Sequence, residues 1–196
     1  MASEQCSERI QNLRHEWRRW LDKIDVRNLI FIDETGVNLS MIRRYGRCEG
    51  GGRVYAHRPG NQGQNVTLVG AMSDEGLIAT MTLPGGLNTA SFMVYLERIL
   101  LPQLWKGAII VMDNLPVHHA KTVETLIKSF GVKVKFLPPY SPDLSPIELC
   151  WSKIKGIMRN DAARTSETLD AALTKAINEI TDENALNWFN HCGLFL

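Results

Sequence analysis

The chain has 196 residues and a formal net charge of +1, which is the length of one ordinary α/β domain with a sizeable core. Its four cysteines lie far apart and form no Cys-x-x-Cys pair, which argues against a zinc site or a disulfide framework. The sequence shows no signal-peptide pattern, and its apolar runs are too short to cross a bilayer, so we expect a cytosolic protein without a membrane partner.

Residues 3–24 carry apolar side chains at helical spacing with arginines between them. This pattern predicts an amphipathic helix, and packing on the domain explains it better than DNA reading does. We expect an N-terminal helix and linker over residues 1–28, the main domain over 29–181 and a C-terminal tail over 182–196. Residues 1–60 hold 11 Lys and Arg against 8 Asp and Glu, a weak indication of a face for a polyanion.

Two short apolar runs, at residues 29–32 and 108–112, end in Asp33-Glu34 and Asp113-Asn114. Each run predicts a buried strand with an acid at its carboxyl end, which is where ligands bind in an open α/β sheet. Residues 37–45 could form a second strand that pairs with the first as an opening hairpin. Glu34 follows Asp33 directly, so it should face the other side of the strand and form an ion pair or hydrogen bond there.

Residues 43–58 are rich in arginine and contain three consecutive glycines, which is typical of a mobile loop. They lack the Gly-Lys-Ser/Thr sequence of a nucleotide-binding loop. Arginine suits bidentate contacts with phosphate, so this loop is our first candidate for contact with the phosphates of a polyanion, although a solvated basic loop is nearly as good an interpretation. The arginines concerned are Arg43, Arg44, Arg47, Arg53 and Arg58.

The middle of the chain predicts a hairpin around the turn at 73–76, a helix over 89–104 that Asn88 or Thr89 caps, a helix over 120–130 and a strand over 132–137. The overall order is three strands, helix, strand, helix, strand, helix. This order is the pattern of a ribonuclease H-like α/β fold, with a mixed central sheet flanked by helices. A last helix is expected from residue 165 or 166, and a short one in the tail.

Four prolines stiffen the loop at 137–146, which leads into a helix running to about residue 159. Ser145 is placed as the N-cap and Pro146 at the first helical position, so Glu148 stands where a capping box has its acid. On spacing alone, a cap is the preferred interpretation of Glu148. The alternative is that it joins Asp33 and Asp113, and three clustered carboxylates repel one another unless a cation holds them.

These acids lie in motifs that resemble the catalytic domain of mariner-superfamily transposases, and the bacterial insertion-sequence branch fits best. The acids at 113 and 148 are separated by 34 residues, and the similarity runs over about residues 29–180. Ser145 departs from the asparagine usual in the family, but both residues are good N-caps. The motifs are Phe-Ile-Asp-Glu-Thr-Gly around Asp33, Val-Met-Asp-Asn-Leu-Pro-Val-His around Asp113 and Pro-Pro-Tyr-Ser-Pro-Asp-Leu-Ser-Pro-Ile-Glu up to Glu148.

The resemblance implies the ribonuclease H-like fold and two-metal phosphodiester chemistry with Mg²⁺ or Mn²⁺. Oxygen ligands select such hard cations, and two ions can activate a water or a 3′-hydroxyl without a side-chain nucleophile. Asp33 would be shared by both ions, with Asp113 and Glu148 each completing one site. Asn114 and His118 are expected to line the site, His118 as a hydrogen-bond partner, because nitrogen is a poor ligand for Mg²⁺. Trp151 is expected in the core, and Lys153 and Lys155 are further DNA-contact candidates.

The resemblance also implies DNA partners, namely transposon ends and target DNA, and a homodimer on DNA at the nucleoid of a bacterial cytoplasm. Only about 28 residues precede the first strand, which leaves no room for the family's helix-turn-helix module. We therefore expect a separately encoded helix-turn-helix protein or reading frame. Two alternatives stay open: a ribonuclease H-like, structure-specific nuclease, and a truncated, non-catalytic or regulatory transposase remnant.

Overall fold

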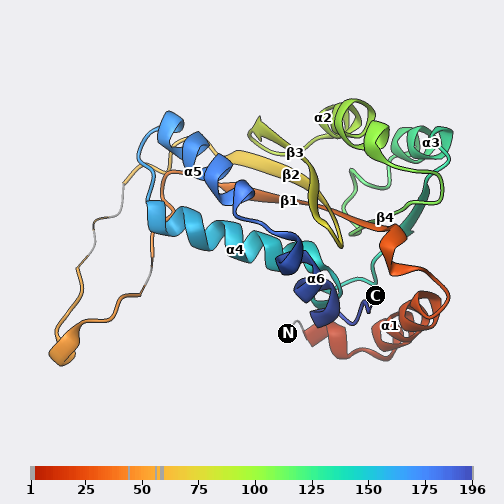
Figure 1. Cartoon of the computed structure of the whole chain (residues 1–196), viewed down its shortest axis with the longest axis horizontal. Helices are drawn as coiled ribbons and strands as arrows, with labels where there is room; N and C mark the ends of the chain where they lie inside the picture. The colour runs from red at the N-terminus through yellow and green to blue at the C-terminus, as the bar shows by residue number, and fades with distance from the viewer. Residues whose placement is uncertain (1–2, 44, 56, 58–59, 196) are drawn as a thin grey trace.

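A computed structural model describes residues 3–43, 45–55, 57 and 60–195 of the chain. Its centre is a five-stranded sheet in the order β3-β2-β1-β4-β5 (Figure 1). The first three strands are antiparallel neighbours, whereas β4 and β5 continue the sheet in parallel with β1. The strands are β1 (Leu29–Val37), β2 (Val66–Ser73), β3 (Gly76–Pro84), β4 (Ile109–Met112) and β5 (Lys133–Phe136).

Helices cover both faces of this sheet, and the alternation of side chains along β1 supplies both cores. Phe31 packs in the core beneath the carboxyl-terminal helices, while Ile30 and Ile32 pack in the core on the other face. On the first face lie α1 (Glu8–Leu21), α4 (Pro146–Asp161), α5 (Ser166–Asn178) and α6 (Asp182–His191). On the second lie α2 (Thr89–Tyr95), extended by a π-helical turn (Leu96–Leu100), and α3 (Lys121–Ser129).

Most of the expected elements are confirmed. The hairpin of β2 and β3 turns at residues 73–76, Asn88 caps α2 with a full capping box, and Thr165 caps α5. Gly131 follows α3 with a φ of +72°, a left-handed conformation that suits glycine at the end of a helix. Among the described residues, no helix is long and apolar enough to cross a bilayer.

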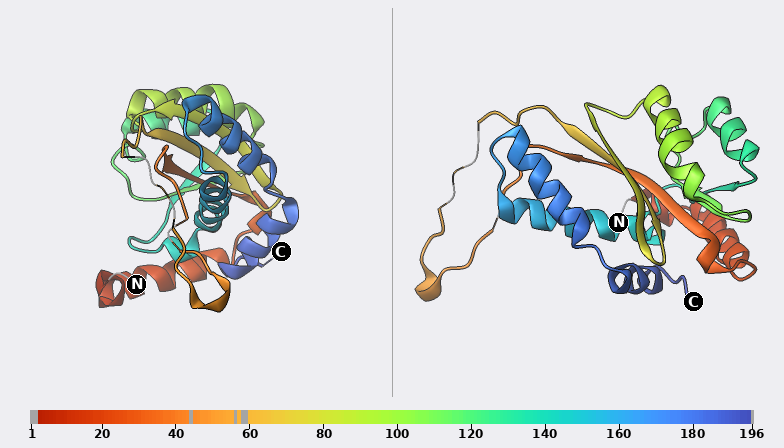
Figure 2. Two further views of the ribbon diagram at one scale, coloured as in Figure 1. Left: turned by 90° about the vertical axis from the view of Figure 1, so that its left-hand side faces the viewer. Right: turned by 45° about the horizontal axis from the view of Figure 1, so that its top comes forward.

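The expected strand at 37–45 is wrong. β1 continues without a break to Val37, pairing with β2 from Phe31↔Met72 to Val37↔Val66, so β2 and not residues 37–45 is its antiparallel partner. The chain then leaves the sheet at Asn38, whose side-chain oxygen accepts a hydrogen bond from the amide of Ser40 at 3.0 Å. Of residues 41–64, those that the structure describes (41–43, 45–55, 57 and 60–64) lie in a long arm that projects away from the body (Figures 1 and 2).

Both ends of the chain pack on the domain. Trp17 of α1 and Phe189 of α6 are buried in the same core as Phe31, and the rings of Phe31 and Phe189 meet edge to face at 5.5 Å. A division at residues 28 and 181 therefore separates segments that share one core; as a division into functional units it stays a prediction.

Candidate active site

Asp33 lies within β1, which continues to Val37. The sequence had instead suggested that Asp33 would lie at the carboxyl end of its strand. The parallel pairing of β1 with β4 stops at Phe31↔Val111, while the pairing with β2 continues through Asp33↔Gly70. Asp33 thus stands just beyond the end of β4, with one side open. Oδ2 of Asp33 accepts a 3.0 Å hydrogen bond from the indole Nε1 of Trp151, which reaches it from α4.

Asp113 follows directly on β4, so both acids stand at the edge where β4 ends. Oδ1 of Asp113 accepts a hydrogen bond from the amide of Leu115 at 3.1 Å and lies 2.8 Å from Nδ1 of His118. Both of these partners come from the turn after β4. One carboxylate oxygen of Asp113 is therefore held by the protein.

His118 is buried and stands between two acids. Its Nε2 lies 3.9 Å from Oε2 of Glu34, and neither atom has a hydrogen-bond partner among the described residues. Glu34 thus faces the other side of β1 from Asp33, as the alternation predicted, and it meets a histidine there. The structure places His118 as the hydrogen-bond partner of Asp113, which agrees with the role expected for it.

Glu148 lies in the first turn of α4, where a capping box was the competing interpretation. Ser145 is the N-cap, but its side chain makes no capping hydrogen bond. The amide of Glu148 bonds to the backbone oxygen of Ser145 at 3.2 Å instead. The capping box is therefore not formed, and helix capping does not explain the presence of the Glu148 carboxylate.

The three acids line one cavity of about 510 Å³. This volume lies in the range of pockets that hold small ligands, roughly 300 to 1,000 Å³. The loop with four prolines forms much of the wall, and Asn114 fixes it by donating a 2.8 Å hydrogen bond from Nδ2 to the backbone oxygen of Leu137. Three segments of the chain thus bring Asp33, Asp113 and Glu148 to one opening, although 79 residues separate the first two acids and 34 the last two.

The pKa values of the three acids are shifted by their burial, by one another's charges and by their hydrogen-bond partners. Burial, and then the charge of Glu148, raise the pKa of Asp33 to about 7. Burial and the charge of Asp113 raise the pKa of Glu148 against the opposing effect of Lys155. Burial would also raise the pKa of Asp113, but the hydrogen bonds from His118 and Leu115 lower it below its ordinary value.

The donor set of this cavity fits Mg²⁺ or Mn²⁺. It offers carboxylate oxygens, which hard cations prefer, and a cation would offset both the burial of Asp33 and the repulsion from Glu148, which together raise the pKa of Asp33. Among the described residues, no group of three or more His, Cys, Asp and Glu is already drawn together around a single point. The acids are therefore gathered around a cavity rather than closed into a cage.

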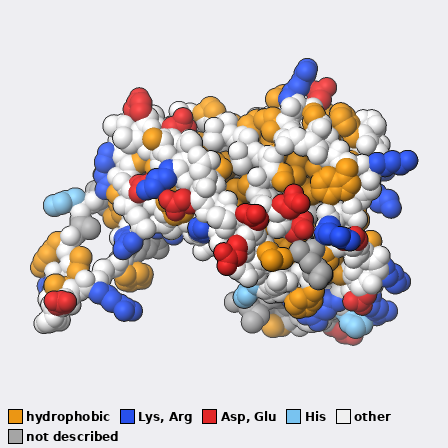
Figure 3. All heavy atoms as spheres, in the orientation of Figure 1, with side chains coloured by type: hydrophobic (Ala, Val, Ile, Leu, Met, Phe, Trp, Pro, Cys, Tyr) orange, Lys and Arg blue, Asp and Glu red, His pale blue; other side chains and the backbone are white. Residues whose placement is uncertain are grey.

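The basic residues expected to contact DNA have different surroundings. Nζ of Lys153 donates to the backbone oxygen of Glu179 at 2.7 Å and to Asn184, so it joins α4 to α6, whereas Lys155 lies close enough to Glu148 to influence its pKa. In the arm, Arg43 donates to Asn160 at the end of α4, and Arg47 and Arg53 are exposed. Arg44 and Arg58 lie outside the described residues. Figure 3 shows Lys and Arg side chains along the arm and over the end of the molecule where α1 lies.

Sequence reasoning missed two residues of the cavity wall, Arg9 and Tyr140. Arg9 belongs to a helix whose pattern indicated only packing, and the convergence of Arg9 and Glu148, 139 positions apart in the chain, on one cavity has no local signature. Tyr140 stood inside a recognised motif, but it was not singled out.

A mixed sheet in this order, helices on both faces and an acid-lined cavity at the end of β4 define the catalytic-domain architecture of ribonuclease H-like nucleic-acid enzymes. The chain matches the family model of the DDE superfamily endonucleases over residues 28–170, and it belongs to that family. No curated protein sequence matches the chain.

Solved structures of Mos1 mariner transposase share the fold. A Mos1 paired-end complex with Mn superposes with a TM-score of 0.73 at 21% identity, covering 98% of this chain and 60% of that one. The Mos1 catalytic domain gives a TM-score of 0.68 at 18% identity, covering 98% of this chain and 90% of that one. The predicted ribonuclease H-like transposase fold is confirmed. The chain spans 60% of the Mos1 chain in the paired-end complex, and the bacterial branch stays a prediction.

Proposed function

We propose that this chain is the catalytic domain of a DDE transposase, which cleaves phosphodiester bonds at transposon ends and transfers the 3′ end to target DNA. The observation that carries the proposal is that Asp33, Asp113 and Glu148 line one cavity. The family to which the chain belongs supports the reaction class, and the cavity supports the proposed location of the reaction. No nucleophilic side chain is required, since a water or a 3′-hydroxyl attacks the phosphorus.

Asp33, Asp113 and Glu148 would together hold two Mg²⁺ or Mn²⁺ ions, with Asp33 shared between them. When bound, the ions activate the attacking oxygen and stabilise the leaving oxygen. The protein's own part is to hold the carboxylates in place. Trp151 fixes one oxygen of Asp33, while His118 and the amide of Leu115 fix one oxygen of Asp113.

The partner of this site is DNA. Mos1 has been solved as a paired-end complex with its left transposon end. We propose that this chain likewise acts as a homodimer on transposon ends and target DNA, at the nucleoid of a bacterial cytoplasm. A separately encoded helix-turn-helix protein or reading frame would supply the recognition of the ends. The exposed Arg47 and Arg53 of the arm are suited to contacts with the DNA backbone.

A nicking assay on plasmid DNA tests the proposal. The purified chain should nick the plasmid in Mg²⁺ or Mn²⁺, and Asp113→Asn should abolish nicking. Glu75→Gln, which changes an exposed acid in the turn between β2 and β3, is the matched control and should nick like the wild type. Nicking by Asp113→Asn at the wild-type level would refute the site.

Strand transfer separates the proposal from its alternatives. Given DNA with a free 3′-hydroxyl at a precut end, a transposase joins it to the plasmid, whereas a structure-specific nuclease only cuts. A chain that binds metal but neither nicks nor joins DNA, even with the recognition protein present, would be a regulatory remnant.

A further inference from the structure

Two residues of the cavity wall have no part in holding metal. They are Arg9 of α1 and Tyr140 of the loop that leads into α4. They reach the cavity from different segments, and one is cationic while the other is aromatic. Their side chains therefore suit a ligand that has both a negative charge and a flat ring.

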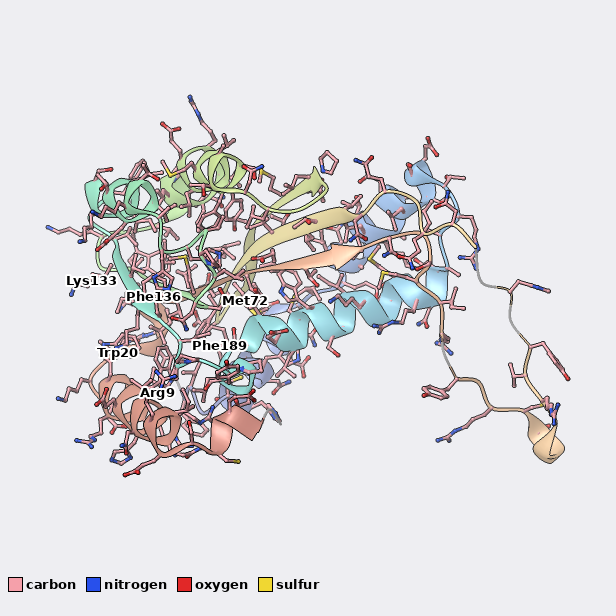
Figure 4. The ribbon with its side chains drawn as sticks, turned by 180° about the vertical axis from the view of Figure 1, so that it is seen from behind. Arg9, Trp20, Met72, Lys133, Phe136 and Phe189 are labelled. Atoms are coloured by element: carbon pink, nitrogen blue, oxygen red, sulfur yellow. The ribbon has the colours of Figure 1, made fainter. Side chains whose placement is uncertain are left out.

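Arg9 is brought to the cavity because α1 is fixed to the loop before Glu148. The buried guanidinium of Arg14 donates hydrogen bonds of 3.0 and 2.6 Å to the two carboxylate oxygens of Asp143, and Gln5 donates a third of 3.0 Å. Asp143 lies just before the N-cap of α4. Figure 4 shows Arg9 on α1, on the side that faces the sheet.

Arg9 does not serve to neutralise the acid cluster. Among the described residues it forms no ion pair, and it does not contribute to the pKa shifts of Asp33, Asp113 or Glu148. It is also the only Lys or Arg among the described residues that line the cavity. Its guanidinium, which forms bidentate hydrogen bonds with phosphate, is therefore available to an anionic ligand.

Tyr140 has a left-handed backbone conformation, which is unfavourable for most residues other than glycine. Its φ is +56°, and it is followed by Ser141 and Pro142 in a loop that two prolines also precede. Strain of this kind is concentrated at functional sites, where the surrounding structure imposes it. Here the ring is left 51% exposed at the wall of the cavity rather than packed in the core.

We propose that Arg9 and Tyr140 form a strand-binding subsite of the catalytic cavity. Arg9 binds a phosphate next to the reacting one, and Tyr140 stacks on an unpaired base of the same strand. Stacking of a base on an aromatic ring needs an open face, which a base inside a duplex does not offer. The inference rests on the proposed function and adds to it that the DNA is locally unpaired at the cleaved position.

The first test is binding of a short single strand of thymidines in Mg²⁺, measured by fluorescence anisotropy. Arg9→Gln should weaken binding about tenfold, or about 1.4 kcal/mol, and make it less dependent on salt by about one counterion. Arg9→Lys should keep the salt dependence. Arg19→Gln changes an exposed arginine on the same helix outside the cavity, and it should change binding less than about twofold. Equal effects of Arg9→Gln and Arg19→Gln would overturn the phosphate contact.

The second test compares the thymidine strand with an abasic strand of the same length. Tyr140→Asn removes the ring, and Asn tolerates left-handed backbone better than most residues, so the fold should melt no lower than the wild type. The Tyr140→Asn variant should bind the thymidine strand about tenfold more weakly, which is within the range for losing one base-stacking contact. Its affinity for the abasic strand should be unchanged. Tyr140→Phe should bind both like the wild type. An equal loss on both strands, or no loss on either, would overturn the stacking contact.

The nicking assay distinguishes the two proposals. If the wild type nicks plasmid, Asp113→Asn does not, and both Arg9→Gln and Tyr140→Asn bind single strands like the wild type, the subsite is refuted and the transposase function stands. If both variants lose binding as expected, while Asp113→Asn nicks as well as the wild type, the catalytic proposal fails and the single-strand subsite stands.

Discussion

The indole nitrogen of Trp151 donates a 3.0 Å hydrogen bond to Oδ2 of Asp33, and this contact depends on Gly70. Gly70 is the residue of β2 that pairs with Asp33, and the Trp151 ring lies directly against it. A Cβ built on Gly70 would lie 2.6 Å from Cη2 of the indole, closer than real contacts allow. The missing side chain thus leaves the room through which α4 reaches the acid in β1.

Gly70→Ala should therefore disturb the site as well as the fold. β2 pairs on both of its edges, so the indole must move and its hydrogen bond to Asp33 must lengthen. We expect a loss of about 1 to 3 kcal/mol in the free energy of unfolding, the usual cost of overpacking, together with a loss of nicking. Thermal melting and the plasmid assay measure the two effects.

Gly36→Ala is the matched control, because Gly36 lies in β1 and its added Cβ would have no neighbour closer than 4.0 Å. It should melt and nick nearly like the wild type. If Gly70→Ala behaves in the same way, the indole is not confined as the structure indicates.

The raised pKa of Asp33 predicts how the metal-free domain responds to pH. The folded-state pKa is about 7, whereas the ordinary value is 3.8, so the unfolded chain releases this proton first as the pH rises. Stability should fall between these values and level off above about pH 7. Asp33→Asn should reduce this fall and, without metal, be more stable than the wild type at about pH 8. The gain should be at most a few kcal/mol, since each pKa unit corresponds to about 1.4 kcal/mol.

Melting curves at several pH values, with and without Mg²⁺, check this expectation. Mg²⁺ should stabilise the wild type most where Asp33 is ionised and should stabilise Asp33→Asn much less. Equal slopes of stability against pH in the two metal-free proteins would show that the titrating group is not Asp33.

The three acids could be singled out from the sequence because each one lies next to a recognisable local pattern. Asp33 and Asp113 follow short apolar runs that predict buried strands, and Glu148 follows a proline-rich loop and an N-cap. The spacing did not decide between a cap and a cavity residue for Glu148. The Ser145 side chain makes no capping hydrogen bond and Glu148 lines the cavity, while its catalytic role stays a prediction.

The remaining features depend on contacts between distant segments. Trp151 was expected in the core and is there, with 2% of its surface exposed, but no pattern predicts that its one polar atom meets Asp33. The strand expected at 37–45 failed because Val37 is the last residue of β1, Leu39 and Met41 pack against the core, and β2 supplies the partner for β1. Pairing between strands is a tertiary property, and propensity alone does not fix it.

Glu148→Gln should separate charge from helix capping. No capping hydrogen bond is lost, and the charge that raises the pKa of Asp33 is removed. The metal-free variant should therefore melt at the wild-type temperature or higher, while Mg²⁺ stabilises it less and nicking is lost. Glu167→Gln, in the first turn of α5, is the control and should nick normally. A fully active Glu148→Gln would remove Glu148 from the active site.

His118 should act on metal binding through Asp113. His118→Phe keeps a ring in the buried position beside Phe92 but removes the nitrogen that lies 2.8 Å from Oδ1 of Asp113. The pKa of Asp113 should then rise, because this hydrogen bond helps to keep it low. Loss of such a supporting partner typically costs 10- to 100-fold in metal affinity or activity, so we expect a shift of about that size in the Mg²⁺ concentration needed for nicking.

Two measurements distinguish this positioning role from a packing role. A Mn²⁺ titration followed by thermal shift should show weaker binding, and high Mg²⁺ should restore much of the nicking by His118→Phe. His119→Phe changes the adjacent histidine, which is exposed, stacks on Phe136 and acts on the pKa of Asp113 only through its charge, so it should raise the Mg²⁺ requirement less than His118→Phe does. If His118→Phe requires no more Mg²⁺ than His119→Phe, then His118 only fills space beneath Asp113, and the orientation of that carboxylate comes from the amide of Leu115 alone.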